Sequence, residues 1–308
     1  MSIKIASAPC CWGVDDPENP YLPHWKTVLN EASTAGYKGI ELGPYGYIPL
    51  DIDSVSRELQ NLDLNIIAGT IFDDLVAPAN LTNLLQQAEN ICQFITRLPM
   101  PAAEQDQKFP LPYLVIIDWG HPERDIKAGH GDTALRLSEP NWQRMISHIR
   151  AIAAIARKYG VRAVIHPHAG GYIEFADEIE KLVSDIDYEL AGLCLDTGHL
   201  YYSGMDPELW LRKYSHKVDY IHFKDIDLSV YQQIMQKEIT FFAACARGVM
   251  CPIGKGVIDY TALKTCLEDI NYHGFITIEQ ERDPRNSDTS LRDVTESRLF
   301  LHQVGFDH

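Results

Sequence analysis

The chain has 308 residues, 45% of them hydrophobic, and a formal net charge of −16. This length can bury one large core, and the acidic balance without any Lys/Arg cluster argues against nucleic acid or an anionic membrane as a partner. The seven cysteines form no CxxC pair and no apolar run reaches about 18 residues, so we expect a cytoplasmic protein without a disulfide framework or a membrane span.

Short apolar segments alternate with longer amphipathic segments along the chain. The apolar segments predict strands at residues 3–9, 37–42, 64–71, 112–118, 162–168, 190–196, 217–223 and 274–280. The amphipathic segments predict helices at residues 24–36, 55–63, 80–98, 142–160, 176–186, 207–215, 260–270 and 290–305. Eight strand–helix pairs predict an α/β protein with one (β/α)₈ TIM barrel domain over residues 1–308. An open doubly wound sheet is the alternative, but it should carry a GxGxxG or GxxxxGK[ST] signature, and neither occurs.

Two segments break this alternation. Residues 99–111 are rich in proline and polar residues and are expected to form a loop. Residues 226–258 form a long excursion after the seventh strand, with a short helix expected within residues 231–248. In a barrel, this excursion lies on the face where active sites are built, so we expect it to wall or cover the site.

The last four expected strands each end in a residue type that binds metal ions. The strings are VIHPHAGG, LCLDTGHL, YIHFKD and ITIEQERD, and their candidate ligands are His166, Asp196, His222 and Glu279. Taken singly, each residue could equally make a hydrogen bond in the core or cap a turn instead of binding a metal ion. Together they are expected to converge at one end of the barrel. Nitrogen and oxygen ligands without thiolate indicate a divalent cation, with Mn²⁺ or Co²⁺ favoured over Mg²⁺ because two ligands are histidines.

Other polar residues lie beside these ligands. His168 and Glu281 each lie two residues beyond a candidate ligand, so each shares its face if the chain stays extended. The candidates for proton transfer are His168, His199, Glu281 and Lys224. The candidates for substrate contact are Glu41, Glu174, Lys224 and His199, of which the two glutamates could equally be structural.

The ordered strings DTGH, HFKD and the strand-eight glutamate resemble the xylose isomerase-like barrel superfamily of sugar isomerases and epimerases. The inosose dehydratase branch is similar over a longer set, which consists of HPHAG followed by Glu174, DTGHLYYSGMDP, HFKD, FFAACARGVMCPIGKGVIDY and IEQERDP, within about 160–285. The resemblance implies a divalent metal held by side chains of strands five to eight. The superfamily usually has glutamate where this chain has His166, whereas the dehydratase branch is similar in having histidine. The fourth ligand therefore stays open between His166, His168, Glu174 and water.

This resemblance implies a metal-dependent dehydratase, a lyase acting on an inosose-like cyclic polyol ketone. The same groups would serve a sugar or keto-sugar isomerase or epimerase, or a lyase that cleaves C-glycosides, because each reaction begins with loss of a proton next to a carbonyl. A barrel that binds metal or sugar without catalysis is the alternative from another class. Nucleic-acid cleavage is disfavoured by the acidic charge. The expected partner is a small polyol ketone or keto-sugar, and the chain could assemble as a homo-oligomer.

Overall fold

The computed structural model describes residues 3–103 and 106–306. Nine parallel strand segments form one sheet in the order β3–β2–β1–β11–β8–β7–β6–β5–β4. These segments are β1 (Ile3–Ser7), β2 (Gly39–Ile40), β3 (Asn65–Ile66), β4 (Ala68–Asp73), β5 (Tyr113–Asp118), β6 (Arg162–Ile165), β7 (Ala191–Asp196), β8 (Val218–Phe223) and β11 (Gly274–Ile278).

The two ends of this order meet at Ile67, the single residue between β3 and β4. The Ile67 N–H donates to the Ile40 carbonyl, and the Ile67 carbonyl accepts from the Tyr113 N–H. β3 and β4 are therefore two parts of the third strand, and the sheet closes into a barrel with eight strand positions. The predicted (β/α)₈ fold is confirmed.

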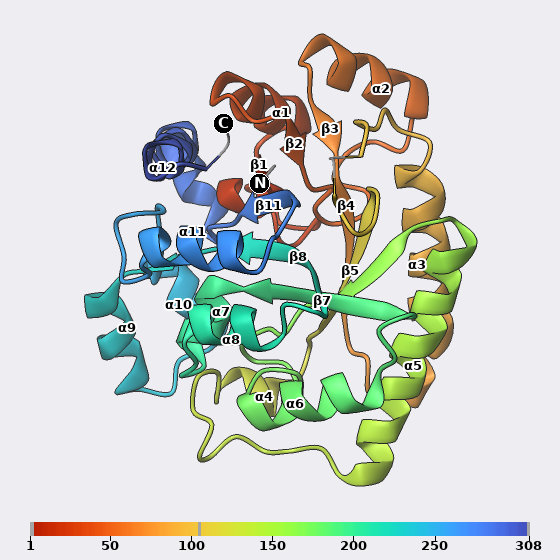
Figure 1. Cartoon of the computed structure of the whole chain (residues 1–308), viewed down its shortest axis with the longest axis vertical. Helices are drawn as coiled ribbons and strands as arrows, with labels where there is room; N and C mark the ends of the chain where they lie inside the picture. Colours follow the sequence, from red (N-terminus) through yellow and green to blue (C-terminus); the bar gives the residue numbers. More distant parts are fainter. Residues whose placement is uncertain (1–2, 104–105, 307–308) are drawn as a thin grey trace.

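Eight helices follow the eight strand positions and cover the outside of the barrel (Figure 1). They are α1 (Trp25–Thr34), α2 (Ile52–Asn61), α3 (Leu81–Ile95), α5 (Glu139–Lys158), α6 (Ala176–Asp185), α8 (Pro207–Lys213), α11 (Tyr260–Asp269) and α12 (Ser290–Val304). Their apolar faces pack against the sheet, so strands such as β5 and β7 are buried along their whole length. Burial on both faces explains why these strands are nearly continuous apolar runs in the sequence.

Element ends differ from the predicted ones where a local residue sets the boundary. Helix α2 begins at Ile52 rather than at residue 55, because the Asp51 carboxylate caps it by accepting from the N–H groups of Asp53 and Ser54. Strand β6 stops at Ile165 instead of reaching residue 168, and Pro167, which has no N–H, follows directly. Strand β11 likewise ends at residue 278 rather than 280.

The excursion at 226–258 is more structured than the single short helix expected there. It contains α9 (Leu228–Met235), α10 (Phe241–Ala246) and β10 (Met250–Cys251), which pairs antiparallel with β9 (Asp225–Ile226). The buried Asp225 carboxylate accepts from the N–H groups of Gly254, Gly256 and Ile258, at 2.8, 3.0 and 3.0 Å, and so holds the end of the excursion. In Figure 1 the arrowheads of β7 and β8 point toward α9, α10 and α7 (Thr197–Tyr202), so the excursion lies at the carboxyl ends of the strands.

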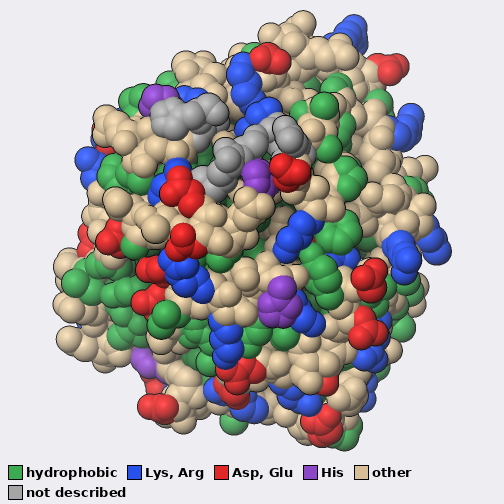
Figure 2. Space-filling view, viewed as in Figure 1, with side chains coloured by type: hydrophobic (Ala, Val, Ile, Leu, Met, Phe, Trp, Pro, Cys, Tyr) green, Lys and Arg blue, Asp and Glu red, His purple; other side chains and the backbone are tan. Residues whose placement is uncertain are grey.

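Short helices complete the connections, namely α4 (Pro122–Asp125), η1 (Pro9–Trp12), η2 (Pro78–Asn80) and η3 (Pro284–Thr289). Within the described ranges, no helix has both the length and the apolar character needed to cross a membrane. Acidic and basic side chains are interspersed on the face shown in Figure 2. The expected domain bounds, 1 and 308, and residues 104–105 of the expected loop lie outside the described residues.

Candidate metal and proton-transfer centre

The carboxyl ends of β6, β7, β8 and β11 bring the four candidate ligands together inside the barrel. His166, Asp196, His222 and Glu279 each offer one nitrogen or oxygen atom, and these four atoms lie within 4.8 Å of one another. The strand register explains the convergence, since Asp196 of β7 pairs directly with His222 of β8. We refer to these four residues as the metal group.

Polar atoms of the metal group are buried without hydrogen-bond partners in the described chain. They are both ring nitrogens of His166, Asp196 Oδ2 and His222 Nδ1. Such atoms are costly to bury without a hydrogen bond. A divalent cation would satisfy one nitrogen of His166, His222 Nδ1 and Asp196 Oδ2, which also lies 3.2 Å from Lys224 Nζ. Burial lowers the pKa of His166, which favours the neutral ring that metal binding needs. Burial alone would raise the pKa of Glu279, but His222 and Lys224 hold it well below its usual range, so this ligand is anionic.

Glu41 holds His222 from the side away from the other ligands. Its Oε1 atom lies 2.8 Å from His222 Nε2 and accepts from the Tyr220 hydroxyl at 2.7 Å. The Glu41 carboxylate accepts this hydrogen bond, which holds a ring proton on Nε2. Burial alone would lower the pKa of His222, but Cys194, Glu279 and Glu41 raise it well above its usual range, so a cation bound at Nδ1 would take the place of a second ring proton. His222 Nδ1 faces Glu279 Oε2 at 3.0 Å and Asp196 Oδ2 at 3.9 Å. A carboxylate behind a histidine in this way is typical of metal sites.

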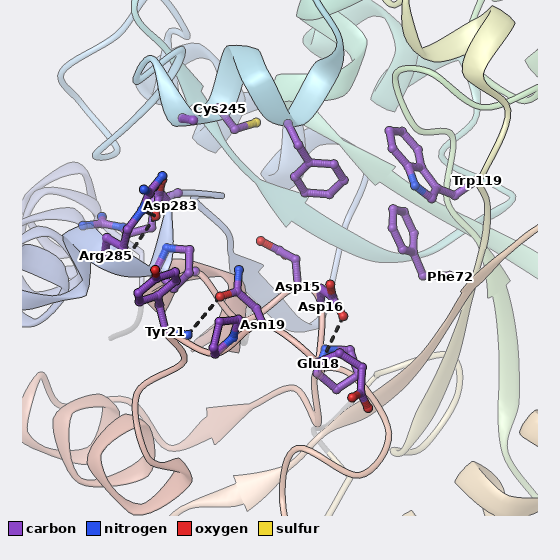
Figure 3. A pocket seen from close by; sticks show the side chains of 17 residues that line it. Asp15, Asp16, Glu18, Asn19, Tyr21, Phe72, Trp119, Cys245, Asp283 and Arg285 are labelled. Carbon is purple, nitrogen blue, oxygen red and sulfur yellow. Dashed lines mark hydrogen bonds and ion pairs between the residues drawn. The ribbon is translucent and has the colours of Figure 1, made fainter.

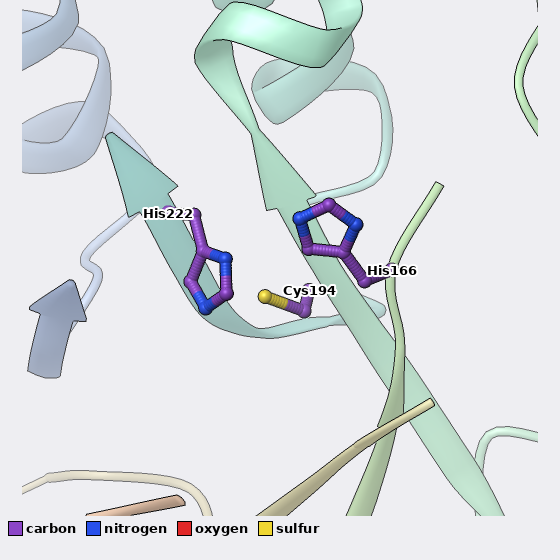
Figure 4. Close-up of side chains that lie close together, drawn as sticks. All are labelled: His166, Cys194 and His222. Carbon is purple, nitrogen blue, oxygen red and sulfur yellow. The ribbon is translucent and has the colours of Figure 1, made fainter. Parts of the chain in front are cut away.

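A thiol lies beneath the metal group (Figure 4). Cys194 is two residues before Asp196 on β7, so both side chains point into the barrel, and the sulfur groups with His166 and His222. Burial raises the pKa of Cys194 to about 11, which keeps it protonated. The carboxylates are therefore better ligands than this thiol for a hard or borderline cation. The sequence analysis missed Cys194 because it has the apolar character of the strand around it.

Three of the expected proton-transfer residues form a second group beside the metal group. His168, His199 and Glu281 offer atoms within 4.8 Å of one another. Lys224 joins the two groups, since its Nζ atom lies 2.8 Å from Glu279 Oε2 and 2.6 Å from Glu281 Oε1. Burial alone would lower the pKa of Lys224, but the surrounding carboxylates raise it well above its usual range. The buried side chain is therefore an ammonium ion.

The peptide unit at Ala169 contacts both histidines of the second group. The Ala169 N–H donates to His199 Nδ1 at 3.1 Å, and His199 Nε2 lies 2.9 Å from Lys224 Nζ. The Ala169 carbonyl lies 2.9 Å from His168 Nδ1 and can only accept, which leaves His168 Nε2 unprotonated. Burial is the largest of the effects that lower the pKa of both rings well below the usual range, so both are neutral. His168 Nε2 is therefore the base that this pair offers, whereas both nitrogens of His199 already contact the chain.

Glu281 is the candidate acid of the second group. Burial is the main cause that raises its pKa, and the nearby Glu279 charge adds to it, while Lys224 opposes it. Its Oε2 atom is buried without a hydrogen-bond partner among the described residues. A carboxyl group in such surroundings is suited to hold and release a proton.

Glu174 lies outside this arrangement, contrary to the expected substrate contact. Its Oε1 atom accepts from the Gly129 N–H at 2.7 Å and the Ser203 hydroxyl at 3.0 Å. Its Oε2 atom accepts from the Gly170 N–H at 2.9 Å and from Arg124 at 3.3 Å. All of these donors belong to loops or short helices around the site, so Glu174 connects these segments. Because both of its oxygens already accept two hydrogen bonds, Glu174 is a poor candidate for the fourth metal ligand.

Both groups border an inner cavity of about 400 Å³. Six of the predicted site residues line it, namely Glu41, His166, His168, Lys224, Glu279 and Glu281. Walls from the first half of the chain were not predicted, and they include Cys10, Asp15, Tyr45, Thr70, Phe72, Asn83 and Gln87. Their one signal in the sequence is that several follow the end of an expected strand, which many surface residues also do.

The sequence of residues 29–301 matches the family described as Xylose isomerase-like TIM barrel. The chain belongs to this family. An inosose dehydratase of Clostridium perfringens (strain 13 / Type A) is 27% identical to this xylose isomerase-like barrel over 285 residues, which cover 92% of this chain and 91% of that protein.

Two solved structures share the fold of this xylose isomerase-like barrel. The IolI protein with a binding zinc atom superposes with a TM-score of 0.73 at 13% identity, covering 99% of this chain and 100% of that one. An L-ribulose 3-epimerase superposes with a TM-score of 0.69 at 16% identity, covering 99% and 94%. At these identities the likeness concerns the fold alone.

Proposed function

We propose that this protein is a metal-dependent dehydratase, a carbon–oxygen lyase that acts on an inosose-like cyclic polyol ketone. The observation that carries the proposal is the convergence of four metal-ligand side chains beside a histidine with an unprotonated Nε2 and a buried carboxyl group on one cavity. The similarity to an inosose dehydratase over 92% of the chain supports the same reaction.

The metal group is proposed to hold one divalent cation through His166, Asp196, His222 and Glu279. Bound there, the cation would act as a Lewis acid toward the ketone oxygen. Two nitrogens and two carboxylates suit Mn²⁺, Co²⁺ or Zn²⁺ better than Mg²⁺. Glu41 is proposed to orient His222, a role that replaces the direct substrate contact expected from the sequence.

His168 and Glu281 are proposed to move the protons. His168 Nε2 removes a proton from the carbon next to the ketone, and Glu281 donates a proton to the hydroxyl group leaving from the adjacent carbon. One C–H and one C–O bond break, a C=C bond conjugated with the ketone forms, and water leaves. His168 then releases its proton to solvent and Glu281 regains one. The ammonium group of Lys224, which lines the inner cavity, is proposed to bind a substrate oxygen, and His199, whose Nε2 lies 2.9 Å from Lys224 Nζ, is proposed to position it.

Charge restricts the substrate class. The acidic side chains Asp15, Glu41, Glu279 and Glu281 line the inner cavity, and Glu279 among them is held in its charged form by His222 and Lys224. The basic side chain among the described lining residues is Lys224, which already lies beside two carboxylates. A phosphate or carboxylate on the substrate would therefore meet an acidic lining without a free cation to pair with. An uncharged polyol ketone fits better than a sugar phosphate.

An epimerase or isomerase is the second candidate, because His168 and Glu281 could also remove and return a proton at one carbon. Metal-loaded protein incubated with inosose should show growing absorbance of a conjugated enone. Interconversion of a keto-sugar without enone formation would favour the epimerase. Bound metal with neither reaction would favour a non-catalytic binding barrel.

Substitutions test the assigned roles in the same assay. Asp196→Ala should lose both bound metal and turnover. His168→Gln should keep the metal and lower kcat by about 10²-fold to 10⁴-fold, the usual contribution of a general base. The exposed His216 supplies a matched control, since His216→Gln should change neither quantity. Retained metal in Asp196→Ala would overturn the assignment of the metal group.

A further inference from the structure

The inner cavity adjoins a second, larger cavity of about 780 Å³ (Figure 3). Asp15, Pro17, Phe72 and Phe242 line both cavities, so the two spaces meet at these side chains. Each has a volume within the range of about 300–1,000 Å³ that is typical of small-molecule sites. A single ring that reaches the metal group occupies the inner cavity and leaves the outer one to another part of the ligand.

One wall of the outer cavity is aromatic. Phe72 and Trp119 are stacked, with ring centroids 5.1 Å apart and an interplanar angle of 16°. Phe242 stands edge-on to both rings, at 6.2 and 5.2 Å. The same rings contact the proposed base, since the His168 centroid lies 5.3 Å from both Phe72 and Trp119. The aromatic wall therefore runs from the reacting groups into the outer cavity, and three half-buried rings that line this cavity favour a planar or ring-shaped apolar partner.

The opposite wall carries basic side chains that are already paired. Arg285 donates to Asp283 at 2.9 Å, and Arg282 donates to Asp293 at 2.9 Å. In Figure 3, Asp283 and Arg285 lie across the cavity from Phe72 and Trp119. Among the described lining residues, no basic side chain is thus left to neutralise a phosphate or carboxylate. Asp15 lines both cavities as a further acidic side chain and offers no positive charge to an anion.

We infer that the outer cavity is a subsite for a second, uncharged ring, so that the preferred substrate is a neutral keto-glycoside. Its ketone-bearing sugar ring occupies the inner cavity, and its aglycone ring lies against Phe72, Trp119 and Phe242. The inference rests on the proposed function, because the metal group defines which ring reacts. It extends that function from a free cyclic ketone to a two-ring conjugate.

Unreactive glycosides test the subsite without turnover. Methyl and phenyl β-D-glucopyranoside share the sugar ring and lack the ketone, so they bind without reacting. With Mn²⁺-loaded protein, calorimetric titration should give a Kd about tenfold lower for the phenyl than for the methyl glycoside. The 4-carboxyphenyl glycoside should lose this gain, because its charge meets the acidic walls. Equal Kd values for the methyl and phenyl compounds would overturn the inference.

Variants locate the gain in the aromatic wall. Trp119→Ala should abolish the phenyl advantage while leaving the Kd of the methyl glycoside within about twofold, and Phe242→Leu, on a different element, should act in the same direction. Tyr201→Ala is a matched control, because Tyr201 lines a separate cavity of about 470 Å³ and should leave the advantage intact. A phenyl advantage that survives both Trp119→Ala and Phe242→Leu would place the second ring elsewhere.

Inosose turnover by the same preparation separates the two proposals. Water loss from inosose without any phenyl advantage would leave the dehydratase standing and overturn the subsite. A phenyl advantage that depends on Trp119, without metal-dependent turnover of inosose, would support the subsite and overturn the proposed reaction.

Discussion

Glu41→Gln is the substitution that best separates a metal-orienting role from a substrate-binding role. The Glu41 carboxylate accepts from His222 and Tyr220 and is buried, with 2% of its surface exposed. Glutamine has nearly the same size and keeps one accepting oxygen, but it loses the charge. Its amide group can also rotate and donate to His222 Nε2. The ring proton would then move to Nδ1, the atom that faces the metal group.

The expected magnitude follows from the contacts that are lost. A hydrogen bond to a charged group contributes about 1.5–3 kcal/mol, against about 0.5–1.5 kcal/mol for a neutral one, so loss of charge alone costs roughly 1–1.5 kcal/mol. That free energy corresponds to about a tenfold weaker metal affinity. Population of the wrong tautomer weakens binding further, toward the roughly 100-fold effect seen when outer partners of metal-binding histidines are replaced.

Competition between the metal-free protein and a fluorescent chelator for Mn²⁺ gives the affinity directly, and the visible spectrum of bound Co²⁺ reports the ligand geometry. Tyr220→Phe is the matched control, because it removes another donor to Glu41 Oε1 and leaves the His222 contact in place. We expect a smaller loss of affinity in that variant. An unchanged Kd for Mn²⁺ in Glu41→Gln, together with a raised KM, would refute the orienting role and restore direct substrate contact.

Contacts elsewhere in the site predict the behaviour of three other variants. Lys224→Met leaves buried carboxylates without their cation, so its metal-free form should melt at a lower temperature than the wild type. Added metal should raise the melting temperature of this variant more than that of the wild type, and equal increases would contradict the role of Lys224. Glu174→Gln weakens the contact with Arg124, and we expect urea unfolding to show that the free energy of unfolding falls by about 1–3 kcal/mol with little change in KM. A raised KM with an unchanged free energy of unfolding would instead support direct contact between Glu174 and substrate. Burial opposes ionisation of His121, but its hydrogen bond to Asp118 raises its pKa above the usual 6.5. The contribution of the charged ring to the free energy of unfolding is therefore fully present below pH 6.5 and is lost as pH rises through the folded pKa. Chemical denaturation across this pH range should show a flatter stability curve for His121→Gln, and an unchanged slope would exclude His121 as its source.

The strand ends could be predicted from the sequence because barrel geometry does most of the positioning. Once four parallel strands end in His166, Asp196, His222 and Glu279, closure of the sheet leaves little freedom in where those side chains meet. The hydrophobic alternation was sufficient to place the strands, whereas their ends moved by a few residues, at a proline after β6 and without such a residue at the end of β11.

The roles of the glutamates were not accessible in the same way. Glu41 and Glu174 have similar sequence surroundings, in that each lies near an expected strand end, yet one touches a metal-group histidine and the other binds loop backbone. Many of their partners are distant in sequence, with Glu41 separated from His222 by 181 positions and Glu174 from Gly129 by 45. Hydrogen bonds across such separations depend on the packed interior, which local patterns do not encode. The tautomer of His168 is hidden from the sequence for a similar reason, because it depends on the position of the Ala169 carbonyl.

The charges around the two groups link the metal to the choice of substrate. Burial opposes ionisation of Asp196 and Glu279, but Lys224 and His222 lower the pKa of both carboxyl groups, and the surrounding acidic groups raise the pKa of His222 and Lys224 in return. A divalent cation at the metal group would take over the charge balance that the His222 proton supplies in its absence. In the proposed reaction, the negative charge that develops when His168 removes a proton would then lie near the cation and Lys224. The acidic lining of the inner cavity opposes an anionic substrate. The carboxylates that would hold the cation therefore also favour the proposed neutral polyol ketone.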